Sequence, residues 1–309
     1  MSRLPYHHLT GIHAATIVPM REDFSMDEDA FRRHVRDVTS CAGMRGLLVN
    51  GHAGENFTLT LHEKKRVVEI ARIEAPADCY IVSGVNQESS LAAAEEAVML
   101  EQAGADALLV FPPNSWALGH ADEVVAIHHQ HVLAATQCPL MIYGAPVGAG
   151  QMAYSIPVLN RLAKEPRICA VKEGSWEVAA YEAHRRHLKH TRPDFIVMGS
   201  GDEHLLTSYL IGNEGSQVSL AAVIPELLCA LWDAASQKRW DDAKAIHDTI
   251  YPLSVAVYRD APGGRATARL KACLKILGRI ECAALRPPQP HASPAEFKIL
   301  EAALKRALG

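Results

Sequence analysis

Short apolar runs alternate with helix-like segments along most of this chain, and this alternation constrains the fold more than any other feature. The runs are short and almost wholly apolar, which is typical of strands buried on both faces of a parallel sheet. Eight such units over about 210 residues favour a closed (β/α)₈ barrel over an open sheet. The predicted strands cover residues 12–18, 47–49, 79–83, 107–111, 140–143, 168–171, 195–198 and 216–220. The predicted helices between them cover residues 27–41, 61–74, 88–103, 121–136, 156–163, 176–189 and 205–211.

The alternation stops near residue 225, and only helical patterns follow. They cover residues 226–236, 240–258, 266–277 and 294–308, with a proline-rich linker at 286–290. A barrel does not need these helices, so we expect a barrel domain over residues 1–224 and a C-terminal helical extension over 225–309. No GxGxxG motif follows the first predicted strand, which disfavours a dinucleotide-binding sheet.

Charge and cysteine usage exclude several functional classes. The formal net charge is −4 and the isoelectric point about 6.5, so no electrostatic argument favours nucleic acid. The seven cysteines are scattered and form no CxxC pair, which fits free thiols in a reducing cytoplasm. Residues 1–10 have no apolar core and no apolar run of about 18 residues follows, so we expect neither a signal peptide nor membrane insertion.

The loops after five predicted strands hold the candidate site. In a barrel, the loops at the carboxyl ends of the strands meet at one mouth, where active sites lie. Each of these loops fits an ordinary turn when taken alone, but their coincidence on one rim indicates a site. The loops are residues 51–55, 111–116, 143–146, 172–174 and 199–203.

Lys172 follows the apolar run 168–171, and Gly174 opens the turn behind it. Apolar surroundings favour the neutral amine over the ammonium ion. A neutral amine can attack a ketone and form a Schiff base. The alternative is a lysine that caps a strand end in water.

A lysine-dependent aldolase or lyase also needs a proton shuttle and an anchor for the substrate carboxylate. Tyr143 ends a predicted strand and is the candidate shuttle; the alternative is an aromatic residue at the edge of the core, with its hydroxyl in water. The turn from Gly51 to Gly54 offers backbone amides to a carboxylate, or is an ordinary turn. Glu55 behind it is expected to be structural.

Three motifs in order point to a known family. They are G-x-x-G-E at residues 51–55, Y-x-x-P at residues 143–146 and V-K-E at residues 171–173. On these motifs, and from residues 11–16 to the C-terminal helices, the chain resembles the dihydrodipicolinate synthase/N-acetylneuraminate lyase family of pyruvate-type Schiff-base enzymes.

The resemblance implies a (β/α)₈ barrel with a helical extension, usually assembled as a homotetramer. It implies that Lys172 forms an imine with a 2-oxo acid, so that no separate cofactor is needed. It also implies that Tyr143 relays protons, that the Gly51 loop binds the carboxylate and that the carbonyl of Val218 faces the amine. Gly174 is placed with the substrate-binding residues.

Departures from the family pattern bear on the substrate. His52 and Ala53 stand where members commonly carry two small hydroxyl residues. His52 either takes part in binding or proton transfer, or fills space beside the turn. Asn114 replaces the second tyrosine of dihydrodipicolinate synthases, and Gly148 replaces their arginine. Without that arginine a second carboxylate loses its forked partner, so a role in lysine biosynthesis is disfavoured.

Asp202 and Glu203, with Ser219, resemble the lyase branch, in which an acidic pair holds sugar hydroxyls. The alternatives are a helix N-cap by Asp202 or a solvated acidic turn. Trp116 and Phe111 are candidates for the wall of an apolar or aromatic site, although core packing also accounts for Phe111.

These features predict a lyase that acts on a 2-oxo acid and makes or breaks a C–C bond with pyruvate as one partner. Two alternatives stay open: a 3-deoxy-2-oxo sugar acid dehydratase that uses the same imine, and a non-catalytic protein that binds a 2-oxo acid. No metal is expected. His128 and His131 share a helix face, but no cysteine or carboxylate lies at ligand spacing nearby.

Overall fold

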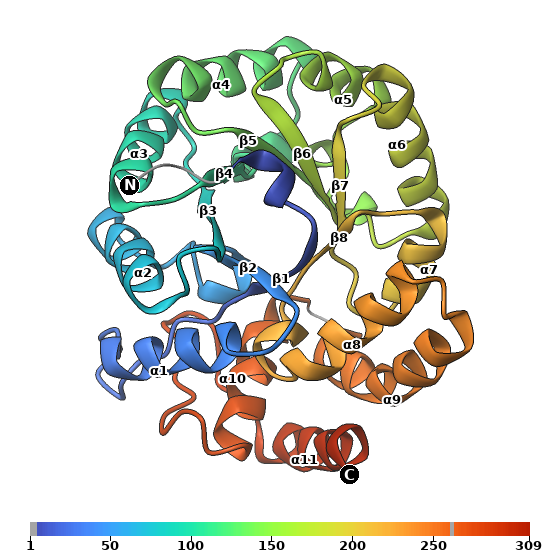
Figure 1. The fold of residues 1–309 in the computed structure, drawn as a ribbon. Coiled ribbons are helices and arrows are strands. Elements are labelled where there is room, and N and C mark those ends of the chain that lie inside the picture. Colours follow the sequence, from blue (N-terminus) through green and yellow to red (C-terminus); the bar gives the residue numbers. More distant parts are fainter. Residues whose placement is uncertain (1–4, 260–262) are drawn as a thin grey trace.

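The computed structural model describes residues 5–259 and 263–309. Within them, eight parallel strands pair in sequence order, and β8 pairs with β1 to close the barrel. Figure 1 shows the strands at the centre and the helices around them. This confirms the predicted (β/α)₈ barrel. The strands are β1 Gly11–Ala15, β2 Met44–Val49, β3 Tyr80–Val85, β4 Ala107–Val110, β5 Leu140–Gly144, β6 Ile168–Glu173, β7 Ile196–Gly199 and β8 Gly215–Val218.

The helices follow the predicted segments closely. They are α1 Glu28–Thr39, α2 Leu61–Glu74, α3 Ser90–Ala103, α4 Asp122–Ala135, α5 Ile156–Ala163, α6 Val178–Thr191, α7 Leu205–Ile211, α8 Pro225–Ser236, α9 Trp240–Tyr258, α10 Ala266–Ile276 and α11 Pro294–Leu308. None of the described helices is long and apolar enough to cross a membrane.

Two boundaries differ from the prediction for clear reasons. Helix α6 begins at Val178 rather than 176, because Trp176 has a positive φ of 60° that a helix cannot contain. The last strand stops at Val218 rather than 220, because the Leu220 amide donates to the Asp202 carboxylate and the chain turns into a short 3₁₀ helix, Leu220–Ala222.

The barrel divides its apolar residues between two cores, as the period of two along a strand requires. In β5, Leu140 and Ile142 pack outward beneath the helices, whereas Met141 and Tyr143 point into the barrel. The interior cluster ends at Leu9, which follows the 3₁₀ turn η1, Tyr6–His8, at the amino end of the barrel. That end is filled, so access to the interior is from the carboxyl ends of the strands.

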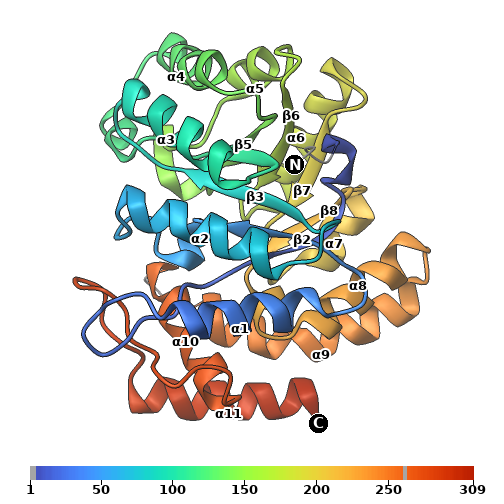
Figure 2. The ribbon, with the colours of Figure 1, turned by 60° about the vertical axis from the view of Figure 1, so that its left-hand side comes forward.

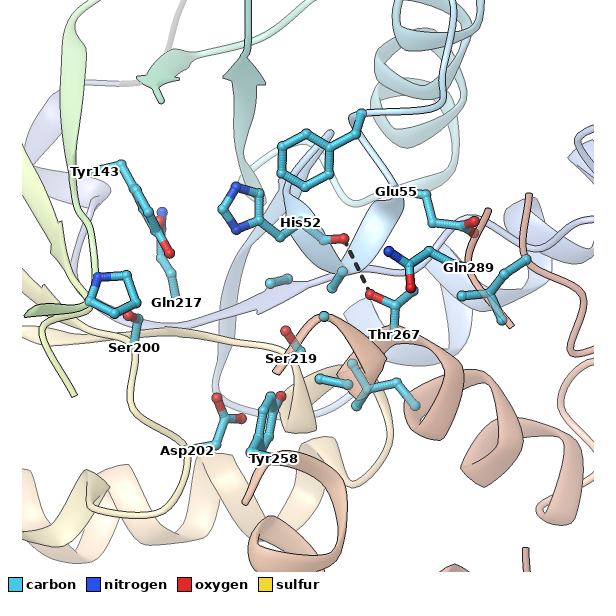
Figure 3. A pocket seen from close by; sticks show the side chains of 18 of the residues that line it. His52, Glu55, Tyr143, Ser200, Asp202, Gln217, Ser219, Tyr258, Thr267 and Gln289 are labelled. Carbon is cyan, nitrogen blue, oxygen red and sulfur yellow. Dashed lines mark hydrogen bonds between the residues drawn. The ribbon is translucent and has the colours of Figure 1, made fainter. Parts of the chain in front are cut away.

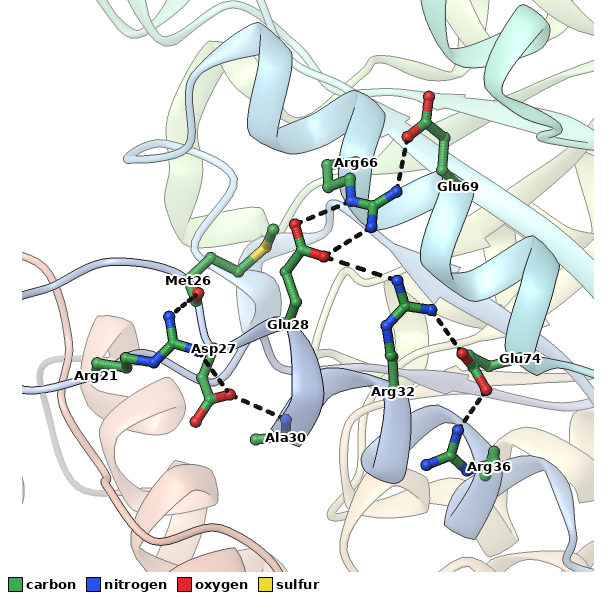
Figure 4. Close-up of polar contacts among 10 residues, drawn as sticks. All are labelled: Arg21, Met26, Asp27, Glu28, Ala30, Arg32, Arg36, Arg66, Glu69 and Glu74. Atoms are coloured by element: carbon green, nitrogen blue, oxygen red, sulfur yellow. Dashed lines mark hydrogen bonds and ion pairs between the residues drawn. The ribbon is translucent and has the colours of Figure 1, made fainter.

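Ion pairs join α1 to α2 on the outside of the barrel (Figure 4). Arg66 donates to both carboxylate oxygens of Glu28, at 2.9 and 2.7 Å. Arg32 and Arg36 both pair with Glu74. Partly exposed pairs of this kind contribute about 0–1 kcal/mol each, so they fix the helix spacing more than they stabilise the fold.

The C-terminal helices wrap the barrel near its mouth. Helix α11 packs on α9 and α10 (Figure 2), and α10 also packs beside the 3₁₀ turn η2, His52–Gly54. Helix α8 packs on β1 as well as on α9. The division into a barrel of residues 1–224 and an extension of residues 225–309 stays a prediction, and the contact of α8 with β1 favours a boundary after α8.

Candidate active site

A cavity of about 770 Å³ opens at the carboxyl ends of the strands (Figure 3). The predicted site residues that line it are His52, Ala53, Asn114, Tyr143, Lys172, Asp202 and Ser219. Residues at the carboxyl ends of six different strands therefore meet at one mouth, as a (β/α)₈ barrel predicts.

Lys172 and Tyr143 lie side by side on neighbouring strands. They are direct partners in the register of β5 and β6, and both point into the barrel. The Lys172 Nζ atom lies 5.9 Å from the centre of the Tyr143 ring. Because the two side chains share one end of the cavity, a small ketone bound there can reach both.

Burial shifts the pKa values of this pair in opposite directions. Loss of hydration lowers the pKa of Lys172 to about 8, against the opposing charge of Asp202. Burial, with the charge of Glu173 behind it, raises the pKa of Tyr143 to about 12. Part of the amine is therefore neutral near physiological pH, while the phenol keeps its proton and can donate it.

The glycine turn is held by the C-terminal extension. Glu55 is buried and pairs with Lys271 of α10. Its other oxygen accepts from the Arg286 amide at 3.0 Å, and Thr267 donates to the His52 carbonyl at 3.3 Å. Glu55 is thus a structural anchor for the turn, as expected.

His52 lies in an aromatic cluster between the turn and the barrel mouth. Its ring lies 4.8 Å from Phe57, 4.5 Å from Phe111 and 5.2 Å from Tyr143, measured between centres. Burial, with the charge of Lys172, lowers the pKa of His52 to about 3. The imidazole is therefore neutral at physiological pH.

The acidic pair does not face the cavity together. Asp202 lines it and accepts from the Leu220 amide at 2.9 Å, and burial raises its pKa to about 7. Glu203 lies outside the lining and accepts from Arg259 Nε at 3.0 Å. The expected sugar-binding pair is thereby reduced to one carboxyl group inside the cavity.

Gly51, Gly174 and Val218 also lie outside the cavity lining. A Cβ on Gly174 would lie 2.8 Å from both the Gly144 carbonyl oxygen and the Ser200 Oγ. The strand ends therefore approach too closely for any other residue. The side chain of Val218 packs in the outer core, and Gly51 accepts the amide of Gly54 at 3.0 Å inside the turn.

Comparison with known proteins identifies the family. Residues 8–307 match the dihydrodipicolinate synthetase family. The chain belongs to this family. It is therefore a Schiff-base, pyruvate-dependent lyase of the kind that works through a covalent lysine imine without a separate cofactor.

Individual relatives of this family member differ in their assigned roles. A 4-hydroxy-tetrahydrodipicolinate synthase from Nitrobacter hamburgensis is 30% identical over 297 residues, 96% of each chain. An uncharacterised DapA-like lyase from Thermococcus kodakarensis is 26% identical over 281 residues, 91% of this chain and 93% of that one.

Solved structures of the family share the fold. Dihydrodipicolinate synthase from Agrobacterium tumefaciens has a TM-score of 0.89 at 25% identity and covers 97% of this chain and 99% of its own. YagE from E. coli K12, solved in complex with pyruvate, has a TM-score of 0.89 at 21% identity, covering 96% and 98%. At these identities the likeness establishes the barrel and its extension, and the substrate stays open.

Sequence patterns missed several residues that line the cavity of this lyase, among them Trp176, Gln217, Tyr258 and Thr267. Trp176 lies in the loop that follows Lys172, between β6 and α6, and this position is a signal that could have found it. Tyr258 and Thr267 come from the extension, whose approach to the mouth no local pattern reveals. The buried Tyr258 hydroxyl lies beside Asp202 and Ser219 (Figure 3), and has no hydrogen bond of good geometry to any described residue.

Two of the histidines on α4, His128 and His129, are buried in the packing of the helix. His128 shares a hydrogen bond of 3.0 Å with Ser90 and packs against Trp116. Neither Trp116 nor Phe111 lines the cavity, and Phe111 packs in the barrel interior with its ring centre 4.5 Å from that of His52. Among residues 5–259 and 263–309, no three His, Cys, Asp or Glu side chains are grouped as a metal site.

Proposed function

We propose that the protein makes or breaks a C–C bond between pyruvate and an aldehyde, with Lys172 as the imine-forming amine and Tyr143 as the proton relay. The observation that supports this best is the placement of the Lys172 amine and the buried Tyr143 phenol as register partners in one cavity. A pKa of about 8 keeps part of the amine neutral near physiological pH.

In the cleavage direction, Lys172 Nζ attacks the ketone carbon of the 2-oxo acid, and the oxygen leaves as water after Tyr143 donates a proton. The resulting iminium ion accepts the electron pair of the breaking C3–C4 bond, while the C4 hydroxyl of the substrate passes its proton to the Tyr143 phenolate and becomes the aldehyde oxygen. The enamine then takes a proton at C3, and water releases pyruvate. Synthesis runs through the same steps in reverse.

The glycine turn is the proposed carboxylate site. The turn that follows Gly51 brings His52 and Ala53 to the mouth near Lys172, and a carboxylate held there leaves the ketone beside the amine. The turn is anchored through Glu55 to the extension, and this supports the role because amide donors that are already held in place lose little freedom when a carboxylate binds.

The two alternative functions can be distinguished by their products. A sugar acid dehydratase using the same imine expels water and releases no pyruvate, whereas a non-catalytic binding protein releases neither. The outward pairing of Glu203 with Arg259 weakens the polyol contacts that a sugar acid needs. Assay of a panel of 2-oxo acids for pyruvate release distinguishes these cases.

Trapping tests the proposal. Borohydride added with pyruvate should increase the intact mass by one reduced pyruvate, and peptide mapping should place it on Lys172. Lys164→Ala, which removes a lysine at the end of α5, is the matched control and should still form the adduct. An adduct on another lysine, or none, would overturn the assignment.

Assembly and location stay predictions. We expect a homotetramer and a cytoplasmic enzyme, and sedimentation velocity at micromolar concentration measures the first. A monomer in solution would show that the cavity is complete within one chain.

A further inference from the structure

The cavity offers one cation to its substrates. Of the described residues that line it, Lys172 alone has a cationic side chain. Four further cations close to the mouth, within residues 5–259 and 263–309, each pair with a carboxylate of this chain. The pairs are Lys271 with Glu55, Arg286 with Glu63, Arg259 with Glu203, and Arg265 with Glu296.

Gly148 adds to this shortage of positive charge. It stands two residues after the Y-x-x-P proline, and nothing lies within 4 Å of where its side chain would begin. Among the described lining residues, an anionic group on the second substrate would therefore meet Asp202 and no cation besides Lys172, and an uncompensated charge is costly to bury. The second substrate is expected to be uncharged.

Aromatic side chains frame the opening of the cavity. Phe57 is 56% exposed although it is a large apolar side chain, and it stacks on His52. Trp176 holds a positive φ of 60° and packs on Tyr258, with 5.6 Å between ring centres. A bulky residue held in an unfavourable backbone conformation at a site, beside an exposed aromatic ring, is a pattern associated with ligand contact.

The extension supplies an apolar floor. Leu270 of α10 and Leu285 line the cavity and are each 1% exposed. The accessible apolar surface of this wall therefore comes from Phe57 and Trp176, with the two leucines packed behind it, and it binds apolar groups through the area removed from water. Polar side chains, among them Asp202, Gln217 and Gln289, also line the cavity, so the apolar surface forms one wall of a mixed site.

We propose that the aldehyde partner of this lyase is an uncharged molecule with an apolar, aromatic body, and that Phe57 contributes to its selection. This inference rests on the proposed function, since it names the second substrate of the same imine. A cavity of about 770 Å³ holds pyruvate joined to one aromatic ring, within the usual range for small-molecule sites.

The test compares three aldehydes condensed with pyruvate by the purified enzyme: benzaldehyde, glyceraldehyde and glyoxylate. We expect kcat/KM for benzaldehyde to exceed both others by about tenfold or more, the usual reach of apolar selection. A preference for glyceraldehyde would show a polyol site, a preference for glyoxylate would show an unpaired cation, and no turnover of benzaldehyde would exclude an aromatic partner. Each of these results overturns the inference.

Variants sharpen the test. Phe57→Ala should reduce the ratio of kcat/KM for benzaldehyde to that for glyceraldehyde about fivefold or more. Ile299→Ala on α11 is the matched control, because Ile299 is 54% exposed but lies away from the cavity. An unchanged ratio in Phe57→Ala would exclude a role for this ring.

The pyruvate adduct separates the two proposals. If borohydride traps pyruvate on Lys172 but benzaldehyde is the poorest aldehyde, the function stands and the inference about its partner is wrong. If pyruvate is not trapped at all, the proposed function itself is wrong.

Discussion

The two ends of the barrel both bury ionisable side chains, yet only one end can do chemistry. At the amino end His13 is fully buried near Tyr80, and loss of hydration lowers its pKa to about 4. At the carboxyl end the same effect lowers the pKa of Lys172 to about 8. The amino end is filled by Leu9 and the turn before it, whereas Lys172 opens into a cavity. Loss of hydration shifts the pKa of both side chains, but only Lys172 can be reached by a substrate and take part in chemistry.

The largest effect is expected from Lys172→Met, which keeps an unbranched side chain of similar length but removes the amine. Turnover and the pyruvate adduct should both disappear, because no other lysine lines the cavity in the described residues. The free energy of unfolding at pH 7 should rise by about 1–3 kcal/mol, because a buried charge is replaced by an apolar side chain. Activity assays, intact mass and urea unfolding measure turnover, the pyruvate adduct and the free energy of unfolding, respectively. A stable variant that retained turnover would contradict the account.

Tyr143→Phe should act on the same end of the barrel with a smaller effect. Loss of the relay should reduce kcat by about 10²-fold or more. Slow formation of the pyruvate adduct should remain, because the amine is intact. A variant with the wild-type kcat would show that protons move by another route.

The pH profile compares the two ends within one molecule. Below pH 8 the rate of adduct formation should rise about tenfold per pH unit and then level off, as Lys172 loses its proton. His13 should leave no inflection near pH 4 in this rate, because it does not touch the substrate. Stopped-flow rates in mixed buffers test this, and a rise that continues to pH 10 would mean that the amine is not desolvated.

The smallest effect on activity is expected from His13→Leu at the closed end. The pKa of His13 is about 6.5 unfolded and about 4 folded, so the unfolded state binds more protons between these values. Wild-type stability should therefore fall by about 2 kcal/mol more than that of the variant between pH 7 and pH 5. Urea unfolding at both pH values measures the difference, and parallel losses would show that His13 is not held neutral.

Local pattern was enough to predict the barrel but not the shape of its site. The strands were predictable because residues such as Met141 and Ile142 must be apolar on both faces of a buried strand. Lys172 and Tyr143 were predictable because each ends such a run. Strand order then sets them side by side, and this also required no distant information.

The rest depended on contacts between residues far apart in the sequence. Glu203 turns from the cavity because Arg259 lies beside it at the end of α9. Tyr258 and Leu270 line the cavity because the extension packs over the mouth of the barrel. The sequence positions of Glu203 and Leu270 do not indicate these partners. Tertiary packing decides whether Glu203 faces the cavity and whether Leu270 lines it.

A crystal structure of the protein soaked with pyruvate tests the central claim most directly. The account predicts continuous density from Lys172 Nζ to C2 of pyruvate, with the Tyr143 hydroxyl within hydrogen-bond distance and the carboxylate at the Gly51 turn. Pyruvate bound without a covalent bond, or bound away from Lys172, would contradict it.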